Sequence, residues 1–128
     1  MKEMTITGLK VAPMLPPEPV TLRNELQALQ EAVSIGADYT GLIEVVELEN
    51  DVCILCNEGS KLIGLAPNRR LGEDILCGVF YVVGQNEDGD FCSLSAEAMT
   101  RYRKFFSIPE EIDPDEVCKT LSTWFWLT

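Results

Sequence analysis

The stretch ILCGVFYVVG, at residues 75–84, constrains the fold more than any other part of the chain. It is the longest strand-like run in the sequence. Apolar side chains occupy both alternating sets of positions, so both faces of such a strand would be buried. The pattern therefore predicts a central strand of a sheet.

Shorter runs of the same kind predict further strands around this one. TITGLKVAP is typical of a first strand, with Gly8 as a candidate bulge. The polar link END joins two later runs, which predicts an antiparallel hairpin that turns near Asn50. Turns are also expected at Pro67-Asn68 and at Asp88-Gly89. The predicted strands are 5–13, 40–48, 51–56, 61–66, 75–84 and 91–94.

Three segments have the spacing of helices. The first runs from Thr21, a candidate N-cap, to about Ser34, and its apolar residues recur every three or four positions: Leu22, Leu26, Leu29 and Val33. Ser95 is a candidate cap for a second helix at 96–106. A cap residue, a proline and an acid follow one another from Asp113, which predicts a third helix to about residue 125.

The order of these elements indicates an α+β fold. We expect a mostly antiparallel sheet with helices packed on one face, in the order β-α-β-β-β-β-β-α-α. Residues 1–106 are expected to form a single α+β domain. Residues 107–128 are expected to form a linker and a C-terminal helix, which packs on the domain or forms a self-association surface.

Charge and composition exclude several classes of protein. A net charge of −11 argues against direct binding to nucleic acid or to an anionic membrane. The sequence contains neither a run of about 18 apolar residues nor a recognisable signal peptide. Its five cysteines are an odd number in a chain without a signal, so we expect reduced thiols and a cytoplasmic location.

Common catalytic and metal-binding patterns are missing. The chain has no histidine, which excludes Ser-His-Asp, Cys-His and His-metal arrangements. Cys53 and Cys56 form a C-x-x-C pattern, but residues three apart on a strand face opposite sides and lie about 10 Å apart, beyond disulfide reach. Neither a glycine-rich phosphate loop nor a complete calcium loop is present. We therefore predict no catalytic, cofactor-binding or metal-binding residue.

Two regions are candidates for binding. Lys61, Asn68, Arg69 and Arg70 gather basic and polar side chains in a loop-rich segment, where arginine could grip an anion or an acidic partner. The alternative is structural, and it is the one we favour. In it, the arginines pair with nearby acids and Asn68 stabilises a turn. The acids available nearby in sequence are Glu58, Glu73 and Asp74.

The second candidate region is the C-terminus. Trp124, Phe125 and Trp126 bring more apolar surface than a short terminal helix can leave in water. Docking of this helix onto the chain's own sheet is one explanation. The other is a partner surface, including a homodimer through the C-terminal helix.

An ordered series of short motifs resembles a known family. The residues are Asn57-Glu58 after a hairpin, Gly64-Leu65, Asn68-Arg69, Gly78 with Phe80, and Ser93-Leu94. Together they resemble the bacterial and phage family catalogued as domain of unknown function 3846, over about residues 9–106. The resemblance implies a small single-domain cytoplasmic protein, often encoded by phages, plasmids and other mobile elements. It implies no activity, substrate or catalytic residue.

Three hypotheses for function follow. The first is a non-enzymatic accessory or protein-interaction module of a phage or mobile element, with an unknown protein partner. The second is an acidic DNA mimic that inhibits a DNA-binding protein, because six acids and no base lie between Asp38 and Ser60. Those acids would otherwise be the solvent face of a hairpin. The third is a small enzyme that uses carboxylates and the arginine pair.

Overall fold

The computed structural model describes residues 3–127, with side chains described up to residue 121. Its main sheet is antiparallel, in the order β2-β1-β7-β4-β3, and β8 pairs with the end of β7. β7 is buried on both faces at the centre of this sheet, as predicted for the apolar run. The strands are β1 (Thr5–Val11), β2 (Glu18–Arg23), β3 (Ile43–Glu49), β4 (Val52–Asn57), β7 (Phe80–Gln85) and β8 (Phe91–Cys92).

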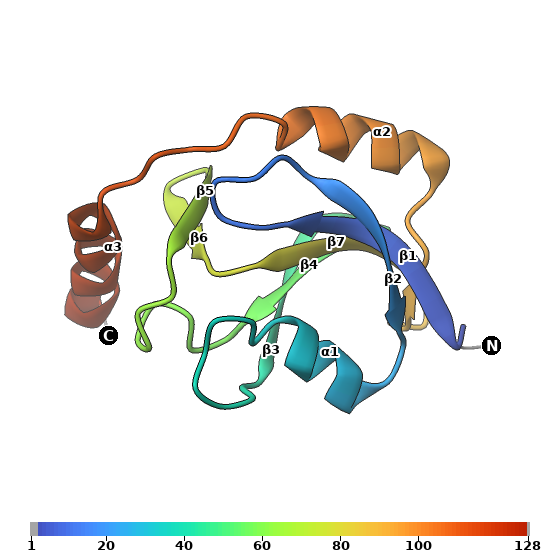
Figure 1. The fold of residues 1–128 in the computed structure, drawn as a ribbon, viewed down its shortest axis with the longest axis horizontal. Coiled ribbons are helices and arrows are strands. Elements are labelled where there is room, and N and C mark those ends of the chain that lie inside the picture. Colours follow the sequence, from blue (N-terminus) through green and yellow to red (C-terminus); the bar gives the residue numbers. More distant parts are fainter. Residues whose placement is uncertain (1–2, 128) are drawn as a thin grey trace.

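Two helices cover opposite faces of the main sheet (Figure 1). α1 (Leu26–Ala32) packs in an apolar cluster with Ile6, Cys53, Leu55, Tyr81 and Val83. α2 (Ala96–Phe105) packs in a second cluster with Leu9, Val11, Ile54, Phe80 and Val82. Neighbouring residues of β4 and β7 alternate between the two clusters, as strand geometry requires.

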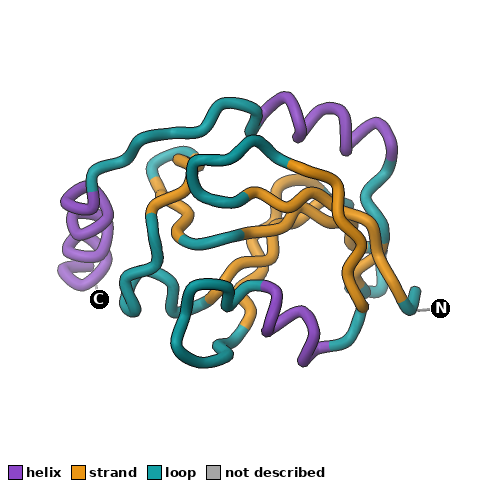
Figure 2. Tube along the Cα trace, in the orientation of Figure 1, coloured by secondary structure: helices purple, strands orange, loops and turns teal. Residues whose placement is uncertain are grey.

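A separate hairpin lies beside the main sheet. It consists of β5 (Pro67–Leu71) and β6 (Asp74–Cys77), and α3 (Pro114–Leu127) lies beyond it. Ile75 and Cys77 pack with Ile112 and Val117 in a small third cluster. The connector between α2 and α3, teal in Figure 2, carries the chain along the hairpin to α3. Among the described residues, no helix is long and apolar enough to cross a membrane.

The α+β class with an antiparallel sheet is confirmed. The placement of the helices differs from the expectation, because α1 and α2 lie on opposite faces instead of sharing one. β4 and β7 are buried on both sides, so each face of the sheet needs its own cover. The element order is also longer than predicted, β-β-α-β-β-β-β-β-β-α-α.

The predicted helix from Thr21 was wrong at its start. Residues Glu18–Arg23 form edge strand β2, and the helix begins only at Leu26. Leu22 packs against the α1 cluster from β2, whereas Leu26 is exposed, so the helical spacing of the leucines spans two different elements. Pairing with β1 satisfies the backbone of this segment, which outweighs a weak local helix preference.

The predictions around the hairpin were also partly wrong. Residues 61–64 form turns and residues 65–66 have no regular structure, where a strand was predicted, and β5 occupies the expected turn at Pro67-Asn68. The long apolar run is split at Gly78, whose φ of +75° takes the backbone out of the strand conformation. A Cβ at Gly78 would lie 2.8 Å from Cδ1 of Leu65. The bend directs β6 into the hairpin and β7 into the main sheet.

Candidate functional site

The four residues predicted to bind an anion divide into two pairs. Asn68 and Arg69, the inner pair, are buried in the protein. Lys61 and Arg70, the outer pair, lie towards α3 and the connector that precedes it. The two halves of the predicted site therefore have different surroundings and different chemistry.

Asn68 joins the hairpin to the main sheet. Its Nδ2 donates to the backbone carbonyl of Val11 at 2.9 Å and to that of Gly78 at 2.8 Å. Val11 ends β1, and Gly78 is the bend between β6 and β7. Both amide hydrogens of Asn68 are thus used to hold two segments that meet at the base of the hairpin. Its role is structural, as favoured, but it bonds distant segments and does not cap a local turn.

Arg69 is also buried, with 1% of its surface exposed. Its Nη2 donates to the carbonyls of Leu15 at 2.7 Å and Phe106 at 3.1 Å, and Nε donates to Phe106 at 3.3 Å. Its Nη1 donates to Oδ1 of Asn68 at 2.8 Å and to the Asn68 carbonyl at 3.4 Å. All five guanidinium hydrogens have an oxygen acceptor, so none is left for a ligand.

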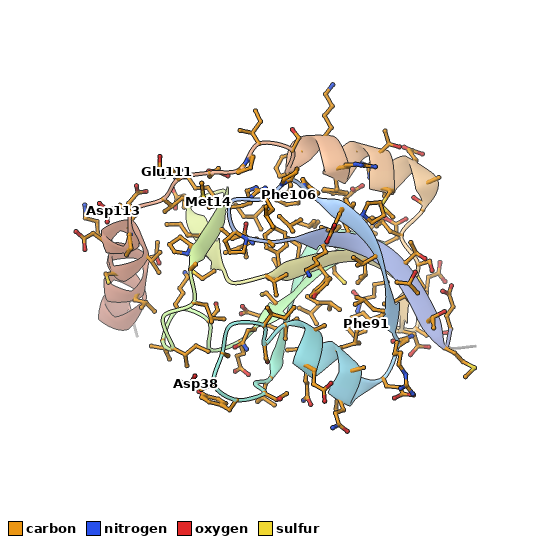
Figure 3. All side chains as sticks on the ribbon, in the orientation of Figure 1. Met14, Asp38, Phe91, Phe106, Glu111 and Asp113 are labelled. Carbon is orange, nitrogen blue, oxygen red and sulfur yellow. The ribbon has the colours of Figure 1, made fainter. Side chains whose placement is uncertain are left out.

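The expected carboxylate partners of Arg69 were wrong. Besides Asn68, its acceptors are carbonyls in the turn after β1 and at the end of α2, 54 and 37 residues away in sequence. Figure 3 shows Met14, the neighbour of Leu15, and Phe106 on the same side of the sheet. Burial lowers the pKa of Arg69 and the nearby charge of Glu110 opposes this shift. Arginine starts from so high a pKa that the side chain remains charged.

The outer pair does form ion pairs. Arg70 contacts Glu110 at 3.1 Å and Glu116 at 2.7 Å, which were not the acids predicted from the sequence. Hydrogen bonds to Glu116, and then to Glu110, raise the pKa of Arg70. Lys61 donates to Asp74, one of the predicted acids, and to Oγ1 of Thr120. These contacts hold the connector and α3 against the hairpin.

A cleft of about 780 Å³ lies between the hairpin, the loop after β4 and α3. Acids and lysines line it together with two buried thiols: Glu44, Glu58, Glu73, Asp74, Lys61, Lys119, Cys56 and Cys77. Burial raises the pKa of the Cys56 thiol to about 12, and the nearby Glu44 adds to this shift. Burial also raises the pKa of Cys77. Both thiols are therefore protonated near neutral pH and are weak nucleophiles and weak metal ligands.

The C-x-x-C pair behaves as strand geometry predicts. Cys53 belongs to the α1 cluster and Cys56 to the α2 cluster, so their side chains lie on opposite faces of β4. Burial raises the pKa of Cys53 to about 11. Within the described part of the chain, no group of three or more Cys, Asp and Glu side chains is placed to hold a metal ion.

The predicted interface at Trp124, Phe125 and Trp126 falls in the last part of α3. The side chains of these three residues lie outside the described residues. Their role in a partner surface or in a homodimer therefore stays a prediction.

Two loops form the other candidate region, and among their residues the sequence singled out only Lys61 as a candidate for binding. The loop at 33–42 follows α1, and the loop at 58–66 follows β4. Ser34 accepts hydrogen bonds from Gly41 N at 2.9 Å and from Nδ2 of the buried Asn57 at 3.2 Å. The backbone N–H of Glu58 donates to the carbonyl of Leu42 at 2.9 Å. These contacts hold the two loops beside each other in a fixed conformation.

The same two loops expose large apolar side chains, which we call the apolar loop surface. Its members and their exposed fractions are Ile35 52%, Tyr39 62%, Leu42 62% and Leu62 72%. Sequence reasoning missed this surface because Leu42 and Leu62 were assigned to the predicted strands 40–48 and 61–66, and Ile35 and Tyr39 lie in a segment without periodicity. The available signal was that Ile35 and Tyr39 fit neither a helical nor a strand face.

Comparison with known proteins identifies the family. A family model described as "Domain of unknown function (DUF3846)" matches residues 4–107. The chain belongs to this family. The resemblance predicted from the sequence is thereby confirmed, and α3 lies outside the matched residues of this DUF3846 domain. No curated protein and no solved structure matches the chain.

Most of the residues that carried the DUF3846 resemblance have structural positions. Asn57 holds the two loops together, and Leu65 fills the space beside Gly36 and Gly78. Asn68 and Arg69 hold the hairpin. Phe80 is buried beneath Phe106, with their ring centroids 5.1 Å apart. This part of the DUF3846 pattern therefore describes how the loops and the hairpin are fixed.

Proposed function

We propose that this DUF3846 domain is a non-enzymatic protein-interaction module whose contact surface is the apolar loop surface. The observation that carries the proposal is the exposure of Ile35, Tyr39, Leu42 and Leu62 on two loops held by internal hydrogen bonds. Exposed apolar side chains on loops that are hydrogen-bonded to each other form a candidate contact site. That the domain is an accessory protein of a phage or other mobile element stays a prediction.

The rigidity of the loops supports binding. A surface that is already ordered loses less conformational entropy when a partner docks, so more of the interaction energy appears as affinity. Ser34 also ties the first loop to α1, because its Oγ donates to the carbonyl of Gln30 in that helix at 2.7 Å. Tyr39 has the side-chain type that most often contributes strongly to protein interfaces.

The two other hypotheses receive less support. A DNA mimic needs rows of carboxylates on one surface, but the acids of β3 lie on both faces of the sheet. Glu44 lies opposite Cys56 on the α2 side, and Glu47 lies opposite Cys53 on the α1 side. Glu49 is already bonded to Arg101 and Tyr102. An enzyme built on the arginine pair would have to free Arg69 from five hydrogen bonds.

Cross-linking followed by affinity capture, from cells that encode the protein, tests the proposal. Three forms are compared: the wild type, the double variant Tyr39→Ser with Leu42→Ser, and a control in which Leu15→Ser is combined with Ile108→Ser. Leu15 and Ile108 are similarly exposed, at 58% and 77%, but lie towards the end of α2. We expect one protein to be captured by the wild type and the control and lost from the loop variant. Equal capture by all three would reject the apolar loop surface as the contact site.

A further inference from the structure

The main sheet has two edges with different backbone properties. β2 forms one edge and carries Pro19, which has no N–H to offer an incoming strand. β3 forms the other edge and contains no proline. Edge strands with free hydrogen-bonding groups can pair with another extended segment, and proline on an edge prevents such pairing.

The register shows which groups of β3 face outwards. Gln85 N donates to the carbonyl of Asp51, and in an antiparallel pair every second residue repeats this pattern. The backbone groups of odd-numbered β4 residues therefore bond to β7, and those of even-numbered β4 residues bond to β3. The bond from Glu58 N to the Leu42 carbonyl agrees with this pattern. Ile43 and Val45 therefore occupy the positions at which the N–H and C=O groups point away from β4. Among the described residues, these groups have no hydrogen-bond partner.

The side chains along this edge specify the chemistry of a partner. Val45 is 44% exposed on the α1 side of β3, and Glu44 is exposed on the other side. Glu44 and Glu47 form no ion pair with any described residue. An added strand would thus place alternate side chains against Val45 on one face and beside the Glu44 carboxylate on the other, whereas Glu47 shares the face of Val45. The irregular register between Glu47 and Glu49 limits the pairing to the first half of β3.

We infer that β3 binds an extended segment of a partner protein in which apolar and basic residues alternate. The segment adds as a further strand beside Ile43 and Val45, with its apolar side chains against Val45 on the α1 face and its basic ones near Glu44 on the α2 face. This inference rests on the proposed function, since β3 directly continues the loop that carries Tyr39 and Leu42. A second copy of this chain is a poor occupant, because pairing β3 with itself would bring four carboxylates to one edge.

Binding of a short fluorescent peptide that alternates valine and arginine tests the inference. A peptide of the same composition, with its valines and arginines in separate blocks, is the control probe. Val45→Pro removes an outward N–H that the fold does not use, and we expect it to weaken binding about tenfold. Thr21→Pro is the matched control on the β2 edge, and we expect no change. Glu44→Gln should weaken binding about threefold and reduce its dependence on salt.

Hydrogen exchange on the wild type gives a second readout that does not depend on a variant folding. The amides of Ile43 and Val45 should exchange rapidly in the free protein and slowly in the peptide complex. Failure of the alternating peptide to bind, or binding that leaves these amides fast, overturns the inference. A different result is that a partner is lost from the variant Tyr39→Ser with Leu42→Ser but is still captured by Val45→Pro. That result would reject only the strand addition and would leave the proposed function standing.

Discussion

Arg69 and Arg70 are adjacent in sequence and have opposite roles. Arg69 is enclosed by carbonyl oxygens from β1's turn and the end of α2, so it holds parts of the main domain together. Arg70 is exposed to solvent and pairs with two glutamates of the connector and α3. The difference follows from β5, which directs neighbouring side chains to opposite sides. A pair of arginines is therefore no evidence for one shared anion site.

The largest effect is expected at Arg69. Arg69→Met leaves the buried carbonyl of Phe106 and the partly buried carbonyl of Leu15 without these donors, and we expect it to lower the free energy of unfolding by about 3–5 kcal/mol. Urea denaturation followed by circular dichroism measures this change. Arg69→Lys, which retains the charge with fewer hydrogen bonds, should recover only part of the loss. If Arg69→Lys recovered the full free energy of unfolding, the positive charge and not the set of hydrogen bonds would account for the stability that Arg69 provides.

Asn68 should show the next largest effect. Asn68→Ala removes the donors to Val11 and Gly78 and one acceptor of Arg69, with an expected loss of about 2–3 kcal/mol in the same assay. Asn68→Asp has nearly the same shape and keeps the acceptor, but it loses both donors. We expect it to be at least as destabilising as alanine. Normal stability of the aspartate variant would contradict the role given to Nδ2.

A smaller and more local effect is expected at Arg70. Arg70→Gln should leave the free energy of global unfolding nearly unchanged but loosen α3. Val117 of α3 packs against Cys77, so this helix shields the Cys77 thiol. We expect Cys77 to react several-fold faster with an alkylating reagent, measured by mass spectrometry of peptides. Arg103→Gln is the matched control, since Arg103 is an exposed arginine on α2 that forms no ion pair within the described residues. Equal alkylation rates of Cys77 in the two variants would show that Arg70 does not hold α3 against the hairpin.

The smallest effect is the dependence of this contact on salt. Exposed ion pairs are screened by dissolved ions, whereas the hydrogen bonds of the buried Arg69 are not. Raising the salt concentration should therefore bring the alkylation rate of Cys77 in the wild type towards that of Arg70→Gln. The urea midpoint of the Arg69 variants relative to wild type should change little. A strong salt dependence of that difference would place Arg69 in an accessible ion pair.

Local signals in the sequence predicted a large part of the fold. Ser95 caps α2 by accepting from Ala98 N at 3.1 Å, and Asp113 accepts from Asp115 N at 2.9 Å at the start of α3. The central strand, the β3–β4 hairpin and the opposed cysteines were also predictable, because each depends on residues close in sequence. Gly78 was visible as a glycine inside the run, but its left-handed backbone depends on packing against Leu65.

The candidate site was less predictable because its contacts are long-range. Asn68 and Arg69 form internal hydrogen bonds, yet nothing near Arg69 in sequence indicates carbonyl acceptors at Leu15 and Phe106. The apolar loop surface is hidden for a related reason. Ile35 and Tyr39 become a candidate contact site only once Asn57 and Ser34 are seen to hold the loops and the side chains of Ile35 and Tyr39 are seen to be exposed.

Native-state hydrogen exchange on the two arginine variants tests the central claim most directly. In Arg70→Gln, amides of α3 and of the β5–β6 hairpin should exchange faster while those of β1, β4 and β7 keep their wild-type rates. In Arg69→Met, exchange should accelerate throughout β1, β4 and β7. A local response to Arg69→Met, or a global response to Arg70→Gln, would contradict the division between an arginine that holds the domain and one that holds its last helix.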